Sequence, residues 1–156
     1  MRALILLIVV VVVLVALGSS SAASRPDLVH LVSITTSGKT TDTPPKGPSK
    51  GDTFTTTSRL LNIRAQFGKP KGAVVGSDRG TVVLTSARAG SVRGVTKLPG
   101  GTLSFRGPLP ASGGGGTIRV VGGTGVFAGA RGMLTITTSQ SGVVVNVYTL
   151  SYPAVA

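Results

Sequence analysis

The hydrophobic and polar positions of this 156-residue chain form short alternating or β-branched runs, which are typical of strands. Glycine and proline separate these runs at short intervals, as turns between strands require. Residues 76–80 interrupt one run, which indicates a turn or a bulge. The pattern predicts about eight short strands, at residues 28–34, 53–59, 73–75 continuing at 81–86, 91–97, 102–106, 117–121, 133–138 and 143–150.

Helix formers are scarce, because the chain contains no Glu and has 23 Gly. Some predicted strands are apolar on both faces, as at residues 143–145, so both sides of the sheet must be covered. A barrel with a filled lumen, covered outside by packed loops or another subunit, satisfies this condition. A β-sandwich has the same rhythm of strands and turns. Of the two, we expect a small antiparallel β-barrel.

One long segment, 37–51 (SGKTTDTPPKGPSKG), has no periodicity and is rich in Pro, Gly, Ser and Lys. A loop of this length is unusual in a compact domain, so we expect it to be either mobile or functional. No repeat of fixed period is present. The sequence therefore predicts one domain, residues 24–156, with a mobile loop at 37–51.

The first residues resemble a secretory signal peptide. Arg2 supplies a positive charge, residues 3–17 are apolar, and residues 18–23 are small. Ser21 and Ala23 fit the positions before a cleavage site, so we expect removal of residues 1–23. A retained membrane anchor is the alternative, although a span usually needs about 20 apolar residues. We therefore expect a secreted, extracellular protein without a membrane span after cleavage; it has no Cys and forms no disulfide.

Charge is strongly one-sided, with 16 Lys and Arg against 4 Asp and a formal net charge of +12. This balance favours contact with anionic partners. Nucleic acid is not expected, because few aromatic residues accompany the basic ones to stack on bases. An exported protein would instead meet anionic envelope polymers, lipid head groups or acidic small molecules. If they have no anionic partner, the basic residues simply lie on the solvent-exposed surface.

Residues 120–132 (VVGGTGVFAGARG) contain a match to a dinucleotide-binding turn, G-x-G-x-x-A. That site needs a following helix and an acidic residue about 20 residues later. Glycine-rich and strand-like residues follow instead, and no acidic residue comes after Asp78. No nucleotide cofactor is therefore expected. We interpret the glycines as a structural turn that returns Val126 and Phe127 to the core, formed by Gly122, Gly123, Gly125 and Gly132.

The order of four segments, 51–52, 76–81, 98–103 and 122–132, resembles the dirigent and allene oxide cyclase barrel family. The piece GGTGVFAGARG is the most specific of them, and the resemblance covers nearly all residues from Asp27 to Leu150. It implies a calycin-like, eight-stranded antiparallel barrel, often a homotrimer, with a lumen open at one end. It further implies a small hydrophobic or phenolic ligand whose coupling or cyclisation the lumen steers. The Arg of the A-R-G motif, here Arg131, is implied at the pocket.

Five residues are candidates for ligand binding, and each has a structural alternative. Arg131 presents a fork of donors to an anion or caps loop carbonyls. Asp78 is a lumen or rim acid or a turn residue, and Asp52 is its only conceivable carboxylate partner. His30 alternates with Leu28, Val32 and Ile34 and is either a lumen base or a packed side chain. Tyr148 donates to a ligand or caps the barrel wall.

No metal site is expected, because zinc sites need several Cys or His ligands and this chain has one His and no Cys. No G-x-S-x-G nucleophile motif is present either. Two hypotheses follow. The first is a secreted barrel that binds a small ligand in its lumen. The second is a non-enzymatic cationic protein of the cell exterior, attached to anionic envelope polymers.

Overall fold

The computed structural model describes residues 25–110 and 115–154. The predicted signal peptide, residues 1–23, lies outside them. Each regular element that the model describes is a strand, and none is a helix that could cross a membrane. The strands are β1 (Leu28–Thr41), β2 (Thr53–Asn62), β3 (Val74–Ser86), β4 (Ala89–Leu98), β5 (Gly101–Pro110), β6 (Gly115–Gly125), β7 (Arg131–Thr138) and β8 (Val144–Ser151).

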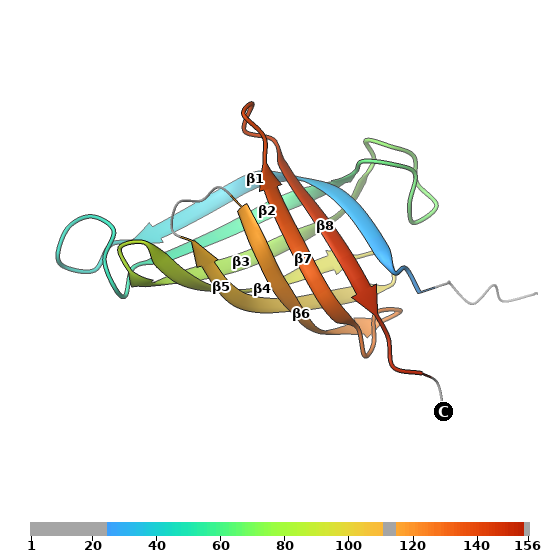
Figure 1. Cartoon of the computed structure of the whole chain (residues 1–156). Coiled ribbons are helices and arrows are strands. Elements are labelled where there is room, and N and C mark those ends of the chain that lie inside the picture. Colours follow the sequence, from blue (N-terminus) through green and yellow to red (C-terminus); the bar gives the residue numbers. More distant parts are fainter. Residues whose placement is uncertain (1–24, 111–114, 155–156) are drawn as a thin grey trace, which may run out of the picture.

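The strands form a closed antiparallel barrel in which each strand pairs with its neighbours in sequence (Figure 1). β8 returns to β1, with a register that runs from Leu28 opposite Thr149 to Ser33 opposite Val144. This seam is the one pairing between strands distant in sequence. The prediction of an all-β, eight-stranded antiparallel barrel is confirmed.

Alternation along β1 decides which side chains face the lumen. Val29 and Leu31 are fully buried, whereas Leu28 and Ile34 are exposed on the outer wall. His30 shares their outward face, so of its two alternatives the lumen base is not the one observed. A shift of one residue moves a strand's whole set of side chains to the other face, and the flanking aliphatic residues gave no sign of which set was inside.

Several strand limits also differ from those predicted. β3 is continuous through residues 76–80, and the irregularity is a shift in register between Leu60 and Leu61 of β2, opposite residues 74–76. β1 continues to Thr41, so the connection to β2 is shorter than the predicted loop at 37–51. β5 and β6 likewise extend into residues 108–116, which were predicted as loop. At the ends of β1, β5 and β6, backbone pairing with the neighbouring strand holds polar and glycine-rich residues in the sheet, although their own strand propensity is low.

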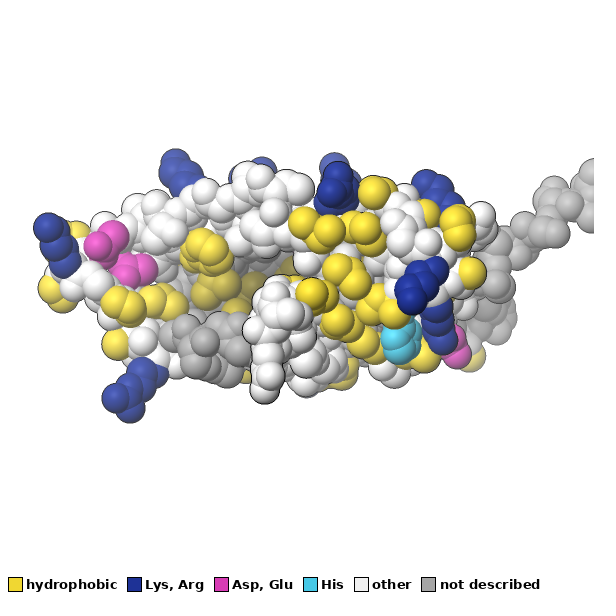
Figure 2. Space-filling model, turned by 90° about the horizontal axis from the view of Figure 1, so that it is seen from above, with side chains coloured by type: hydrophobic (Ala, Val, Ile, Leu, Met, Phe, Trp, Pro, Cys, Tyr) yellow, Lys and Arg dark blue, Asp and Glu magenta, His cyan; other side chains and the backbone are white. Residues whose placement is uncertain are grey.

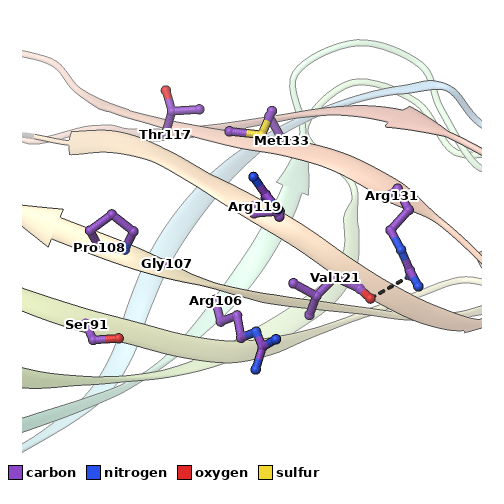
Figure 3. Close-up of a pocket in the computed structure, with 9 residues that line it drawn as sticks. All are labelled: Ser91, Arg106, Gly107, Pro108, Thr117, Arg119, Val121, Arg131 and Met133. Carbon is purple, nitrogen blue, oxygen red and sulfur yellow. Dashed lines mark hydrogen bonds between the residues drawn. The ribbon is translucent and has the colours of Figure 1, made fainter.

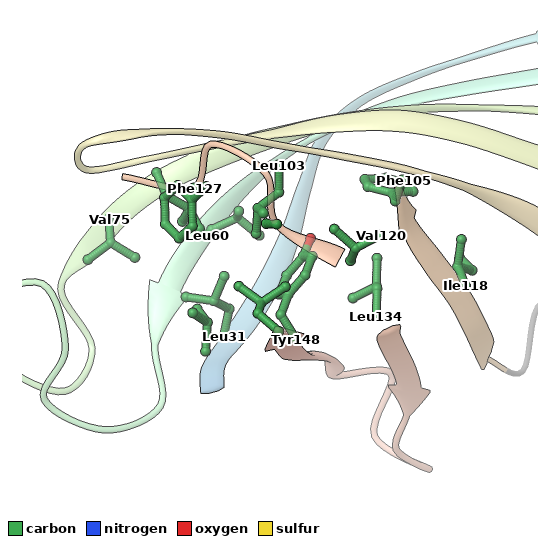
Figure 4. Packing of buried hydrophobic residues seen from close by; sticks show 14 of the residues in the cluster. Leu31, Leu60, Val75, Leu103, Phe105, Ile118, Val120, Phe127, Leu134 and Tyr148 are labelled. Carbon is green, nitrogen blue, oxygen red and sulfur yellow. The ribbon is translucent and has the colours of Figure 1, made fainter. Parts of the chain in front are cut away.

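Large side chains fill one end of the barrel, where β1, β3, β5 and β7 begin. Phe127 enters this end from the turn between β6 and β7 and is fully buried. Figure 4 shows it with side chains that converge from the strands around it. The residues with no exposed surface are Val29, Leu31, Leu60, Thr96, Leu103, Ile118, Val120, Phe127, Ala130 and Tyr148.

The glycine motif forms the wall and turn that hold Phe127, and no helix follows it. Gly125 has a φ of 60°, which glycine adopts readily, and the turn residues Ala128 and Ala130 donate to carbonyls within the turn. Gly123 lies within β6, where a Cβ would stand 2.5 Å from the Phe127 carbonyl oxygen. Gly122 of β6 and Gly132 of β7 are also strand residues, so the turn begins later and ends earlier than predicted. The exclusion of a nucleotide-binding helix agrees with this geometry.

Candidate functional site

The other end of the barrel contains a cavity of about 420 Å³. Its wall is mainly aliphatic and aromatic, with threonine hydroxyls towards the loop between β1 and β2. Figure 2 shows a recess in the surface with apolar side chains in it and Lys and Arg side chains projecting around the molecule. The residues that line the cavity are Thr35, Phe54, Thr56, Ser58, Asp78, Gly80, Val82, Leu84, Val92, Phe105, Leu109, Leu134, Ile136, Val144 and Asn146.

Asp78 is the one charged residue in this lining. Its Oδ2 atom accepts a hydrogen bond from Asn146 Nδ2 at 3.3 Å, and the hydroxyls of Ser58 and Ser33 lie near the carboxylate. Burial raises the pKa of the Asp78 carboxyl above its usual value, and the neighbouring Ser58, Ser33 and Asn146 side chains only partly oppose that effect. The Asp78 position in a strand, with its side chain inward, makes it a lumen acid and not a turn residue.

Asn146 faces the same cavity and is 4% exposed. Its Nδ2 atom donates to Asp78, but its Oδ1 atom is buried without a hydrogen-bond partner among the described residues. A buried acceptor without a partner is costly, and such groups are rare in native structures. This acceptor could therefore receive a hydrogen bond from a ligand in the cavity.

Tyr148 points into the barrel between the cavity and the packed end. Its hydroxyl forms a 2.6 Å hydrogen bond with Thr96 Oγ1, and both side chains have no exposed surface. Burial, above all, raises the pKa of the Tyr148 phenol, so this group stays protonated. Because Thr96 already satisfies the hydroxyl, Tyr148 has the structural role of joining β4 to β8.

Arg131 lies on the outer wall and not in the lumen. Its Nη1 atom donates to the Val121 carbonyl at 2.6 Å (Figure 3) and to the Ala130 carbonyl at 3.0 Å. Arg131 therefore caps backbone carbonyls, which was the structural alternative for this residue. The same side chain borders an outer hollow of about 780 Å³, which Arg106 and Arg119 also line. The resemblance implies that this arginine lies at the lumen pocket, but in this chain it lies outside the lumen.

Asp52 and His30 are likewise outside the cavity. Asp52 accepts hydrogen bonds from Thr43 N at 2.7 Å and Ser49 N at 2.8 Å, and these bonds lower the pKa of its carboxyl. It holds the loop before β2 in place and does not form a carboxylate pair with Asp78. The backbone of His30 exchanges hydrogen bonds with the Gln66 side chain on the outer wall. His30 therefore matches its packed alternative, with its Nε2 atom buried and unpartnered.

The predicted site thus contributes one residue, Asp78, to the cavity, and its neighbours Asn146, Ser58 and Ser33 were not predicted. A signal was present in the sequence. Asn146 stands alone within an aliphatic run at 143–147, and an isolated polar residue in a buried strand needs a partner. No group of three or more His, Cys, Asp or Glu within residues 25–110 and 115–154 could hold a metal ion.

No protein-family model matches this sequence, and no curated protein matches it. Solved structures with a similar fold were found. A pyocyanin demethylase has a TM-score of 0.68 and 21% identity, and the match covers 80% of this chain and 99% of that one.

Two further structures have the same architecture. The Diels–Alderase AbmU from Streptomyces koyangensis has a TM-score of 0.65 and 19% identity, over 81% of this chain and 65% of that one. A pterocarpan synthase dirigent protein has a TM-score of 0.56 and 17% identity, over 81% and 90%. The resemblance predicted from the glycine-containing segments is confirmed for the fold: this chain forms a barrel of the dirigent and allene oxide cyclase-like type.

Proposed function

We propose that this protein binds a small hydrophobic or phenolic molecule in the lumen and holds it for a coupling or cyclisation. The observation that carries the proposal is the cavity of about 420 Å³, whose apolar wall surrounds one polar cluster at Asp78 and Asn146. Small-molecule sites are typically concave and apolar, with a few polar groups that set the orientation. The exposed position of Arg131 does not weaken this, because the polar cluster does not include it.

Asp78 and Asn146 suit a ligand that donates a hydrogen bond. The carboxylate and the unpartnered Oδ1 atom of Asn146 are both acceptors, and the Asn146 Nδ2 atom holds the carboxylate in place. A phenolic hydroxyl fits this arrangement, with its ring against Phe105, Val92 and Leu134. In this role Asp78 orients the ligand by a hydrogen bond, while the apolar wall confines the rest of it.

Confinement is the chemical contribution that such a site makes. Holding two reactive positions of one molecule, or two molecules, in one geometry replaces a rare encounter by a pre-arranged one. The solved structures with this fold are named as a demethylase, Diels–Alderases and a pterocarpan synthase dirigent protein. Those names support the choice of a coupling or cyclisation for this chain and leave its ligand to experiment.

The proposal is tested with two fluorescent probes of nearly equal size. 2-Naphthol carries a hydroxyl donor, whereas 2-methoxynaphthalene does not. We expect the purified protein to bind 2-naphthol more tightly. We expect Asp78→Asn to reduce that preference about fivefold or more, with little change for 2-methoxynaphthalene.

A lumen-filling variant separates cavity binding from surface binding. Gly80 lines the cavity, and a Cβ there would have its nearest neighbours at 3.9 Å, so Gly80→Leu can occupy the space. Val83→Leu adds bulk to the outer face of the same strand and is the matched control. The proposal fails if both variants bind the probes as the unaltered protein does, with circular dichroism showing intact barrels.

Export and assembly belong to the same proposal. Secretion through residues 1–23 is tested by N-terminal sequencing of the exported protein, for which we expect Ser24 as the first residue. A homotrimer is supported by an apolar line on the outer wall, where Val32 of β1 pairs with Leu61 of β2 and with Val145 of β8. Light scattering on the purified protein tests the trimer directly.

A further inference from the structure

Three arginines stand in one line across the outer wall of β4, β5 and β6. Arg93 is the direct cross-strand partner of Arg106, and Arg106 is the direct partner of Arg119. All three side chains are exposed. Neighbouring strands lie about 4.8 Å apart, and like charges directly opposite each other destabilise a sheet. We call these three residues the arginine row.

No acidic side chain offsets this row. The four acidic residues all precede β4, and Asp78, the last of them, faces the lumen. Asp52 is engaged by Thr43 and Ser49 at the loop before β2. The row is therefore a concentration of positive charge that the described part of the fold does not balance, as a site for an external anion would be.

The outer hollow of about 780 Å³ continues from the row towards β7. Arg106 and Arg119 line it, Arg131 borders it, and the Ser91 and Thr117 hydroxyls complete its polar edge. Arg131 is fixed by its bond to the Val121 carbonyl, which leaves a positioned guanidinium at the end of the hollow (Figure 3). Two members of the row, Arg106 and Arg119, thus line a concave surface, which an extended chain can enter and a flat membrane cannot.

We propose that the arginine row binds a polyuronate, a linear polysaccharide with one carboxylate on each sugar. Guanidinium groups pair with carboxylates by two parallel hydrogen bonds, so arginine suits this anion better than lysine does. Successive strands present one arginine each, as successive carboxylates of an extended polymer require. Single-stranded nucleic acid is disfavoured, since the one aromatic residue of β4–β6, Phe105, is buried in the lumen and cannot stack on bases.

Polygalacturonate is the probe for this proposal. The test variant changes Arg93, Arg106 and Arg119 together to Gln. The matched control changes Lys39, Arg59 and Lys71 to Gln, which removes the same charge from exposed residues elsewhere. We expect the test variant to bind polygalacturonate about tenfold or more weakly, and the control to stay within about twofold of the unaltered protein.

Three outcomes would overturn the proposal. Equal losses in both variants would show that net charge alone attracts the polymer. Tighter binding of oligo(dT), or of vesicles containing phosphatidylglycerol, with loss in the same test variant would assign the row to another class of partner. Absence of polygalacturonate binding at low ionic strength would exclude the site. An unchanged circular dichroism spectrum and thermal melting curve would verify the fold of the test variant and keep this result independent of the lumen.

Discussion

The two ends of the barrel lumen share one wall but differ in what fills them. At the end where β1 begins, Leu31, Leu60 and Phe127 meet with no exposed surface. At the other end, Phe54 is 47% exposed and a cavity of about 420 Å³ remains. The difference comes from the chain connections, because the turn after β6 folds Phe127 inward. Packing at one end thus supplies the stability that lets the other end stay hollow.

The polar groups between these two ends show the same contrast. Tyr148 and Thr96 satisfy each other within the packed side, where a hydroxyl without a partner would be costly. Asp78 and Asn146 border the cavity, and Asn146 Oδ1 has no partner among the described residues. The pair Tyr148 and Thr96, in which both hydroxyls are satisfied, has a structural role. The pair Asp78 and Asn146, in which one acceptor beside the cavity has no partner among the described side chains, is suited to binding a ligand.

The largest expected effect comes from removing the aromatic ring that closes the packed end. Phe127→Ala should lower the free energy of unfolding by about 3–5 kcal/mol, since it leaves a cavity in a closed environment. Phe54→Ala makes the same chemical change at the hollow end and should cost about 1 kcal/mol. Urea denaturation of both variants measures the difference. Equal losses would show that the two ends are packed alike.

Glycine-to-alanine changes compare the packed end with the hollow end through a smaller effect on the free energy of unfolding. A Cβ on Gly123 would lie 2.5 Å from the Phe127 carbonyl oxygen and 2.6 Å from that of Thr102. Gly123→Ala should therefore cost about 2 kcal/mol or more. Gly80→Ala has space for its methyl group and should leave the free energy of unfolding unchanged or slightly raised. Thermal melting of the pair tests this, and a stable Gly123→Ala variant would contradict it.

Removing the buried phenol hydroxyl should have a moderate effect. Tyr148→Phe leaves Thr96 Oγ1 buried without its partner, at a cost of about 1–2 kcal/mol. Tyr152→Phe removes a hydroxyl that donates to the Pro26 carbonyl at a partly buried position, and should cost less. Chemical denaturation distinguishes the two. A larger loss for Tyr152→Phe would place the stabilising polar contact at the chain ends instead.

The smallest expected effect is in the dependence of stability on pH. The pKa of Asp78 is raised in the folded protein, so the folded state holds its proton more tightly and stability should rise as pH falls towards 3.8. The pKa of Asp52 is lowered, so its contribution is present above pH 3.8 and is lost as pH falls below it.

Asparagine variants separate these two opposite slopes. Asp78→Asn should flatten the rise above pH 3.8, and Asp52→Asn should flatten the fall below it. Urea midpoints measured across acidic pH provide the readout. A rise that persists in Asp78→Asn would mean that another group causes it.

Much of the fold could be predicted from local patterns. Runs of β-branched residues between glycines and prolines indicated the strands, including the strand β7 that follows the glycine motif. Phe127 was predicted to return to the core, because an apolar pair inside a glycine turn has few other places to go. These features depend on residues close together in sequence.

The candidate site was predicted less well, because it depends on register. For His30 and Arg131 the sequence left a lumen position and a structural position open, and both side chains lie outside the lumen. Asn146 meets Asp78 only after β8 has closed the barrel from the far end of the chain. The arginine row was visible only as a recurrence at residues 93, 106 and 119, whose meaning requires the pairing of three strands.

The consecutive order of the strands has a consequence for how this protein forms. Seven of the pairings join adjacent segments, so each hairpin can assemble as soon as its second half is available. Only the seam between the first and last strands must wait for the whole chain. Until Val29 and Leu31 of β1 pair with Tyr148 and Asn146 of β8, both outermost strands have unpaired edges that can recruit other chains. Closure of that seam is therefore the step at which folding and aggregation compete.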